Sequence, residues 1–161
     1  MLKNTLNSIS PLDGRYATKL GDLEQYFSEF ALIKNRVLVE INWLIFMSRT
    51  KSLSFIPALS KSKENSLLKV IDNFSIKDAE QIKKIEAKTN HDVKAVEIFI
   101  RKKLESLNLN KYKEFVHLFC TSEDINNLSY SLMLKGYLEN EFKEINSTLL
   151  KDLKSKSKKW S

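Results

Sequence analysis

The chain has 161 residues, of which 42% are apolar and 29% are charged, a composition that excludes a disordered or membrane-embedded protein. Three glycines and two prolines are too few for the turns of a β-sandwich or barrel. The single cysteine, Cys120, excludes an internal disulfide and a cysteine-rich zinc site. Because no apolar run is long enough to cross a bilayer and no secretory segment opens the chain, we expect a cytoplasmic protein with no membrane partner.

The net charge of +7 is concentrated at one end, where the last eleven residues hold five lysines and one aspartate. Only four of the 27 basic residues are arginine, the side chain that nucleic-acid and bidentate phosphate sites favour. We therefore interpret the lysines mainly as a solvated surface and expect no nucleic-acid partner. The alternative is a basic nucleic-acid-binding protein that uses its lysine-rich end.

Apolar residues recur at steps of three and four along residues 22–49, which predicts one amphipathic helix. Asp22 is predicted to be its N-cap, with Gln25 as the capping-box partner. A connection rich in serine and lysine follows and leads into a shorter helix over about residues 58–73.

A third helix is predicted over about residues 75–88, because Ser75 and Asp78 have the spacing of a capping box. Asn90 is predicted to cap the next helix, which ends in an asparagine-containing loop at 107–110.

The last predicted helix opens with a capping box of Thr121 and Asp124 and continues without a proline to about Lys158. Its length would be roughly 55 Å, whereas a compact domain of this size is only about 40 Å across. Gly136 lies where the apolar pattern changes phase, so a bend is possible there. The sequence thus predicts an all-α fold whose long helix joins a bundle completed by partner chains or further sequence.

Three polar segments contain residue types suited to anion binding. Residues 10–16 place Arg15 in a glycine-containing turn, and a guanidinium matches phosphate or carboxylate. Residues 89–93 place His91 at a helix start, and residues 117–127 begin the longest helix. A plain structural turn or a well-capped helix start remains the alternative interpretation of each segment.

Thr121 and Ser122 add two hydroxyls to the amide groups at the start of the longest helix. The pair Asn126 and Asn127 needs hydrogen-bond partners if that helix is buried. Cys120 follows an apolar run, so we interpret it as an inert thiol rather than a nucleophile. No metal-ligand spacing and no glycine-rich phosphate loop is found.

Four stretches together resemble the adenylosuccinate lyase family of the fumarase/aspartase superfamily. They are SPLDGRY at 10–16, FSEFALIKNRVLVEINWL at 27–44, TNHDVKAVE at 89–97 and FVHLFCTSEDINNLSYSLMLK at 115–135. The resemblance covers almost the whole chain but only the amino-terminal part of that family. It implies an amino-terminal helical domain over residues 1–111 and, over 112–161, the truncated start of a central long-helix bundle.

The resemblance also implies an activity: β-elimination of fumarate from adenylosuccinate, giving AMP, and from the succinyl-carboxamide ribotide of purine biosynthesis. It implies no metal or organic cofactor and a homotetramer whose sites combine several subunits. The residues that match the family's substrate-binding segments are Arg15, Tyr16, Asn90, His91, Asp92, His117, Thr121 and Ser122. For His91 the resemblance also implies an assisting catalytic role.

The family's general acid lies in a Thr-His-Gly-Gln stretch, and its general base is a serine in a loop that ends in Met-Pro-x-Lys. Neither stretch occurs in this sequence, so we expect negligible turnover from the chain by itself. Two other interpretations remain open. One is a non-catalytic helical assembly module, and the other is a lyase of the same superfamily with another substrate, such as argininosuccinate.

Overall fold

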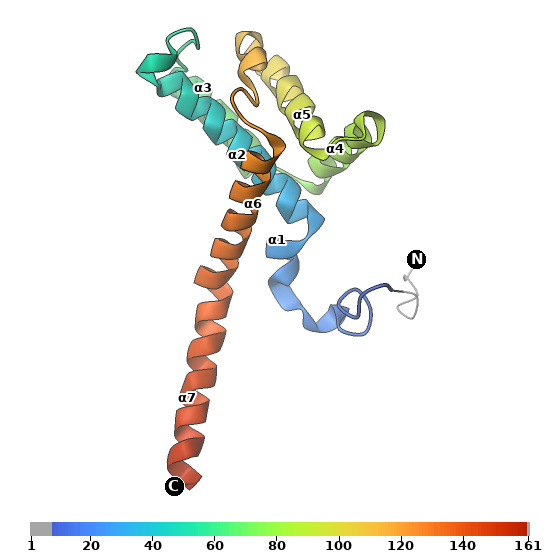
Figure 1. Cartoon of the computed structure of the whole chain (residues 1–161), viewed down its shortest axis with the longest axis vertical. Coiled ribbons are helices and arrows are strands. Elements are labelled where there is room, and N and C mark those ends of the chain that lie inside the picture. Colours follow the sequence, from blue (N-terminus) through green and yellow to red (C-terminus); the bar gives the residue numbers. More distant parts are fainter. Residues whose placement is uncertain (1–7, 161) are drawn as a thin grey trace.

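The computed structural model describes residues 8–160, and over that range the chain forms α-helices, short 3-10 segments and no strand. The all-α prediction is therefore confirmed. The helices are α1 (Glu24–Phe27), α2 (Glu29–Arg49), α3 (Lys61–Asp72), α4 (Ile76–Thr89), α5 (Asp92–Ser106), α6 (Ser122–Tyr137) and α7 (Lys143–Trp160). Figure 1 shows α2 to α5 as one body, with α6 and α7 leaving it as a single long rod.

The core of the body is built around α2, which packs against α3, α4, α5 and α6. The side chains of Val37, Ile41 and Leu44 are completely buried. They belong to one apolar cluster with residues of the other body helices, among them Leu67, Ile82, Phe99 and Leu104. Burial of each such side chain contributes about 1.5–3 kcal/mol, so this cluster holds the helices in place.

The predicted single helix over residues 22–49 is wrong at its start. Ser28 is extended (φ −75°, ψ 162°), and its Oγ accepts a hydrogen bond from the amide of Ala31 at 3.1 Å. The N-cap of α2 is therefore Ser28 and not Asp22, whose backbone lies in a 3-10 turn at Gly21–Leu23 and whose side chain is outside the described structure. A serine hydroxyl competes for helix amides, so it can interrupt an apolar pattern that continues on both sides.

The junction between α4 and α5 also differs from the prediction. Asn90 ends α4 in the left-handed region (φ 51°, ψ 34°), a conformation that asparagine tolerates better than most residues. The N-cap of α5 is His91, whose Nδ1 accepts a hydrogen bond from the amide of Lys94 at 3.1 Å. Asn90 is thus the end of one helix and not the cap of the next.

Both later capping boxes are confirmed, at Ser75 with Asp78 and at Thr121 with Asp124. In the second, the Thr121 amide and hydroxyl each donate to Asp124 Oδ2 at 2.7 Å. These bonds join residues only three positions apart, so the start of α6 is determined locally.

The rod stays helical throughout, because a π-helical segment at Leu138–Phe142 joins α6 to α7. This irregularity follows Gly136, the position of the possible bend, by two residues. A Cβ added at Gly136 would lie 3.4 Å from Cε1 of Tyr26, an ordinary van der Waals contact, so the packing of α1 on α6 does not require a glycine there. Within residues 8–160, no helix is both long and apolar enough to span a membrane.

Candidate functional site

Arg36, on α2, connects the two predicted site segments that begin α5 and α6. Its Nη2 donates to Asp92 Oδ2 at 2.6 Å, and its Nε donates to Asn126 Oδ1 at 2.9 Å. Only 7% of the Arg36 side chain is exposed, whereas 45% of the Asp92 side chain is. The guanidinium fork therefore holds two helix starts side by side at the edge of the core. Arg36 is also the hydrogen-bond partner that a buried Asn126 was expected to need.

Glu40, one turn further along α2, contacts the second of these segments. Its Oε1 lies 2.6 Å from Nδ1 of His117, and its side chain is completely buried. Oε2 is also buried, and within residues 8–160 it has no hydrogen-bond partner. Burial raises the pKa of Glu40 above its ordinary value, and the hydrogen bond and charge of His117 offset only part of that rise.

The loop that carries His117 has an unusual backbone. His117 (φ 65°) and Phe119 (φ 64°) are both in the left-handed region, which costs a non-glycine residue about 1–2 kcal/mol. Between them, the carbonyl of Leu118 accepts a hydrogen bond from Trp43 Nε1 at 2.8 Å. Such a conformation persists only where the surroundings determine it, and here Glu40 and Trp43 hold consecutive residues of the loop.

The carboxylates at the two helix starts are favoured in their ionised form. At Asp92, burial acts to raise the pKa, but the Val93 amide and Arg36 outweigh it, so the pKa lies below its ordinary value. At Asp124, the amide and hydroxyl of Thr121 lower the pKa. The Thr121 hydroxyl is thus occupied in the capping box.

Ser122 has the more available hydroxyl of the predicted pair. It is the first residue of α6 and is half-buried, and among residues 8–160 its side chain has no hydrogen-bond partner. The backbone amides of a helix's first turn have no partner within the helix, so a hydroxyl at this position adds a donor to an anion-binding helix end.

Cys120 lies between His117 and the start of α6. Burial raises the pKa of its thiol to about 11, and the negative charges of Glu40 and Asp124 add to the rise. The thiol is therefore protonated at neutral pH, in agreement with its interpretation as an inert residue.

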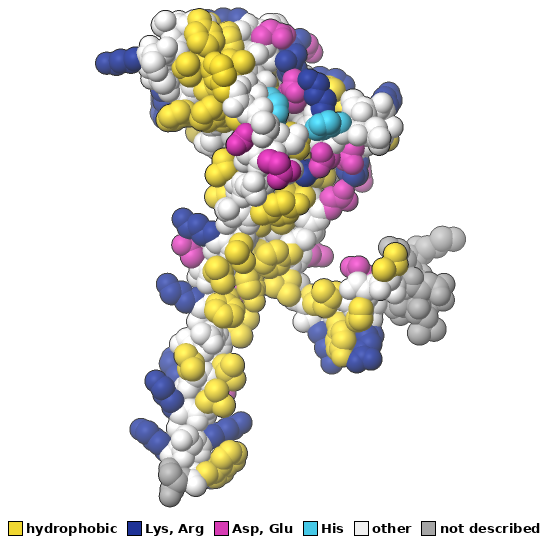
Figure 2. Space-filling model, viewed as in Figure 1, with side chains coloured by type: hydrophobic (Ala, Val, Ile, Leu, Met, Phe, Trp, Pro, Cys, Tyr) yellow, Lys and Arg dark blue, Asp and Glu magenta, His cyan; other side chains and the backbone are white. Residues whose placement is uncertain are grey.

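The structure does not bring Arg15 and Tyr16 to the other predicted site residues. Both are exposed, and the Arg15 guanidinium lies over the Tyr16 ring, 4.5 Å from the centroid, and donates to its hydroxyl. Figure 1 shows this amino-terminal arm projecting away from the body. By contrast, Figure 2 shows the histidine side chains on one face of the body, with acidic and basic side chains around them.

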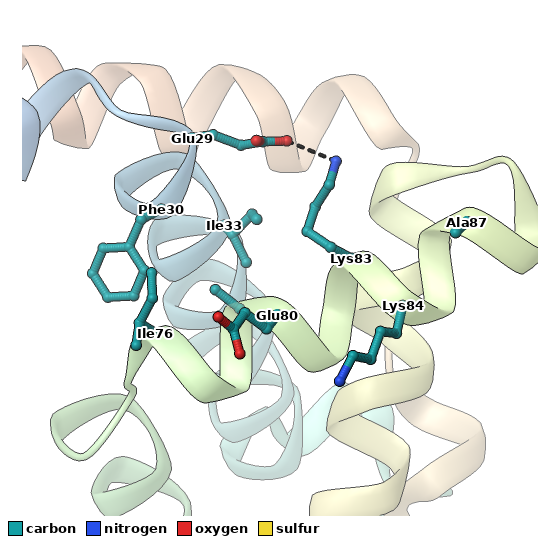
Figure 3. A pocket seen from close by; sticks show the side chains of 9 residues that line it. Glu29, Phe30, Ile33, Ile76, Glu80, Lys83, Lys84 and Ala87 are labelled. Atoms are coloured by element: carbon teal, nitrogen blue, oxygen red, sulfur yellow. Dashed lines mark hydrogen bonds and ion pairs between the residues drawn. The ribbon is translucent and has the colours of Figure 1, made fainter. Parts of the chain in front are cut away.

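A hollow of about 620 Å³ lies elsewhere, between the start of α2 and α4. Figure 3 shows Phe30, Ile33 and Ile76 along it, with an ion pair of 2.7 Å between Lys83 and Glu29 at one side. None of the predicted site residues lines this open hollow. Residues 8–160 also contain no group of three or more His, Cys, Asp or Glu side chains that could hold a metal ion.

Arg36 and Glu40 are the site residues that the sequence interpretation missed. They lie four positions apart on α2, beside the buried residues Val37 and Ile41. Two charged side chains within the apolar stripe of a buried helix were the available signal, since an unpaired charge is rarely buried.

Comparison with known proteins places the chain in a family. The family model described as "Lyase" matches residues 14–161. The adenylosuccinate lyase of Haemophilus influenzae is 48% identical over 135 residues, which is 83% of this chain and 30% of that protein. The adenylosuccinate lyases of Legionella pneumophila strain Corby and Escherichia coli K12 are 46% and 45% identical over 84% and 82% of this chain.

The chain spans about 30% of the length of the curated relatives it matches. Because the family model covers nearly all of the sequence and these relatives share one name, the resemblance inferred from the motifs is confirmed. The chain belongs to the lyase family, and within it the chain is similar to adenylosuccinate lyases.

Proposed function

We propose that this chain supplies substrate-binding residues of an adenylosuccinate lyase, which releases fumarate from adenylosuccinate and from the related ribotide of purine biosynthesis. The observation that carries the proposal is the Arg36 bridge between the starts of α5 and α6. The substrate carries carboxylates and a phosphate, and two adjoining helix starts with a serine hydroxyl and histidines suit such an anion.

In this proposal, Ser122 and the first amides of α6 bind the succinyl end of the substrate. His91 and His117 provide hydrogen bonds from the same face, and Asn90 and Asp92 shape that edge. Thr121 acts through its capping box, which orients the start of α6.

Arg15 and Tyr16 are proposed to bind the nucleotide phosphate of a site on a neighbouring subunit, because their arm lies apart from the other residues within one chain. We also propose that residues 1–111 form a helical domain and that residues 112–161 form the start of a bundle. By themselves, the 161 residues are expected to bind the substrate without converting it, since the proton-transferring motifs are not among them.

Isothermal titration of the 161-residue chain with adenylosuccinate tests the binding proposal. Ser122→Ala is expected to weaken binding by about tenfold or more, the effect of losing a hydrogen bond to a charged group. The matched control is Ser131→Ala, which removes an exposed hydroxyl from the same helix. Equal affinities of Ser122→Ala and the unchanged chain would contradict the proposal, and tighter binding of argininosuccinate would reassign the substrate.

A second role, assembly through the rod, is favoured by its exposed apolar stripe. Leu138, Phe142, Ile145, Leu149 and Leu153 recur along one side of it, and each is between 41% and 60% exposed. Helices with one apolar face bury it against another element, so we propose that copies of this chain pair along the rod, as in a homotetramer.

Sedimentation velocity measures this association. The unchanged chain is expected to sediment as a species larger than 18.7 kDa, and Leu149→Asp is expected to shift it toward the monomer. Ser147→Asp, at an exposed position about half a turn from the stripe on the same helix, introduces the same charge and should leave the distribution unchanged. A monomer at high concentration would rule out pairing. If Leu149→Asp abolishes association while Ser122→Ala leaves the affinity for adenylosuccinate unchanged, the non-catalytic assembly module is favoured.

A further inference from the structure

We propose that Glu40 is a positioning residue that keeps the proton of His117 on Nδ1, so that Nε2 faces the open side of the site as a hydrogen-bond acceptor. The functional part of this inference rests on the proposed function, because it takes the open side to be where substrate lies. The tautomer itself follows from the contacts around one ring.

The contact between Glu40 and His117 determines which of the two groups donates the hydrogen bond. An ionised carboxylate can only accept a hydrogen bond, so when Glu40 is ionised the imidazole nitrogen 2.6 Å from its Oε1 donates, and that nitrogen is Nδ1 of His117. Because Nδ1 faces a completely buried carboxylate, the ring edge that carries Nε2 points the other way. The neutral ring then has its lone pair on Nε2.

The stability of the fold does not account for the buried carboxylate of Glu40. Apart from Arg36, which is held by Asp92 and Asn126, its neighbours on the buried side of α2 are apolar, and its Oε2 has no hydrogen-bond partner within residues 8–160. Burying a carboxylate rarely gains stability over an apolar side chain of similar size, even where the carboxylate has a partner. The contact also ends at His117, whose backbone is itself in the left-handed region. Two unfavourable features thus converge on the orientation of one imidazole.

His91 differs from His117 in the role of its Nδ1. Its Nδ1 accepts a hydrogen bond from the Lys94 amide, so in the neutral ring the proton is on Nε2. The two histidines are therefore held in opposite tautomers, with His91 offering a donor at Nε2 and His117 an acceptor. A substrate held between such groups can be bound through both a donor and an acceptor atom.

The other charged groups around Glu40 do not change the preference of the His117 proton for Nδ1. From α5, Glu97 is buried but held by Lys94 Nζ at 2.8 Å and by Arg101 Nε at 3.0 Å. From α6, Asp124 is held by its capping box. Neither group takes a proton from Nδ1 of His117, so Glu40 remains the acceptor that this nitrogen faces.

Two-bond ¹H–¹⁵N correlation spectra of the histidine-labelled chain test the inference, recorded at pH 8.5 without ligand. We expect His117 to have about a tenfold or greater excess of the Nδ1-protonated form, as for a charge-assisted hydrogen bond. His91 should show the reverse preference and serves as the internal reference. A predominantly Nε2-protonated His117 in the unchanged chain would overturn the inference, whatever the variants do.

Glu40→Gln keeps the shape of the side chain but can either donate or accept, so the excess at His117 should fall several-fold while His91 is unaffected. Glu80→Gln, which removes an exposed carboxylate from α4, should change neither ring. An unchanged His117 spectrum in a folded Glu40→Gln chain would also overturn the inference. Adding adenylosuccinate afterwards should move the His117 Nε2 resonance. If it does not, the proposed function fails while the tautomer assignment stands.

Discussion

Replacement of Arg36 by methionine is expected to lower the free energy of unfolding by about 2–3 kcal/mol and to abolish binding of adenylosuccinate. Methionine keeps the apolar stem but leaves Asp92 without its counter-ion and the Asn126 carbonyl without its donor. Breaking a fully buried ion pair costs about 3–5 kcal/mol. The smaller value applies because 45% of the Asp92 side chain is exposed and water replaces part of the interaction. Urea unfolding followed by circular dichroism gives the difference.

The difference in the free energy of unfolding between the unchanged chain and Arg36→Met depends on pH with a definite sign. The pKa of Asp92 is lowered in the folded chain, so its contribution to stability is present above its ordinary pKa of 3.8 and is lost as the pH falls through the folded value. The gap between the unchanged chain and Arg36→Met should therefore narrow below about pH 3.8.

Two further variants distinguish the effect of the guanidinium geometry from the effect of a positive charge. Lys34→Met removes a positive charge from the same helix at a half-buried position without an ion pair in the described structure, and it should have little effect. Arg36→Lys keeps the charge but cannot reach both partners, so an intermediate loss is expected. An Arg36→Met chain that unfolds at the same urea concentration as the unchanged chain would exclude the bridge as a structural element.

Truncation of Phe99 to alanine is expected to have the largest effect on stability, a loss of about 3–5 kcal/mol. Phe99 is completely buried and meets Phe74 edge to face, with ring centroids 6.0 Å apart. The cluster around Phe99 is built from side chains of α2, α3, α4 and α5, among them Ile41 and Leu104. Because these helices are fixed by their other contacts, the neighbouring side chains cannot collapse into the space that the ring leaves. The cavity therefore remains, and its cost adds to the lost burial.

The matched control is Phe46→Ala, which removes the same side chain from a position that is 57% exposed. It should cost well under half as much, because no enclosed cavity forms. Chemical denaturation at one temperature compares the two. Equal losses would mean that Phe99 lies outside the cooperative core.

Much of the fold followed from the sequence because it depends on short-range interactions. The capping boxes at Ser75 and Thr121 join residues three apart, and the apolar periodicity reports one helix face at a time. The same local rules misplaced two boundaries. Ser28 interrupts a continuous apolar pattern, and Asn90 and His91 are both acceptable at a helix end, so spacing alone could not choose between them.

The motif residues of the candidate site were also found in the sequence, but their arrangement was not. Arg36 reaches partners 56 and 90 positions away, and Glu40 reaches His117 across 77 positions. Such contacts form only when α2, α5 and α6 pack, and no period or spacing encodes them. The sequence by itself thus determined the helices, their caps and the polar segments, because these depend on neighbours within about one helical turn. Only the tertiary structure decided which segments meet and which ring nitrogen faces outward, because burial and long-range pairing set both.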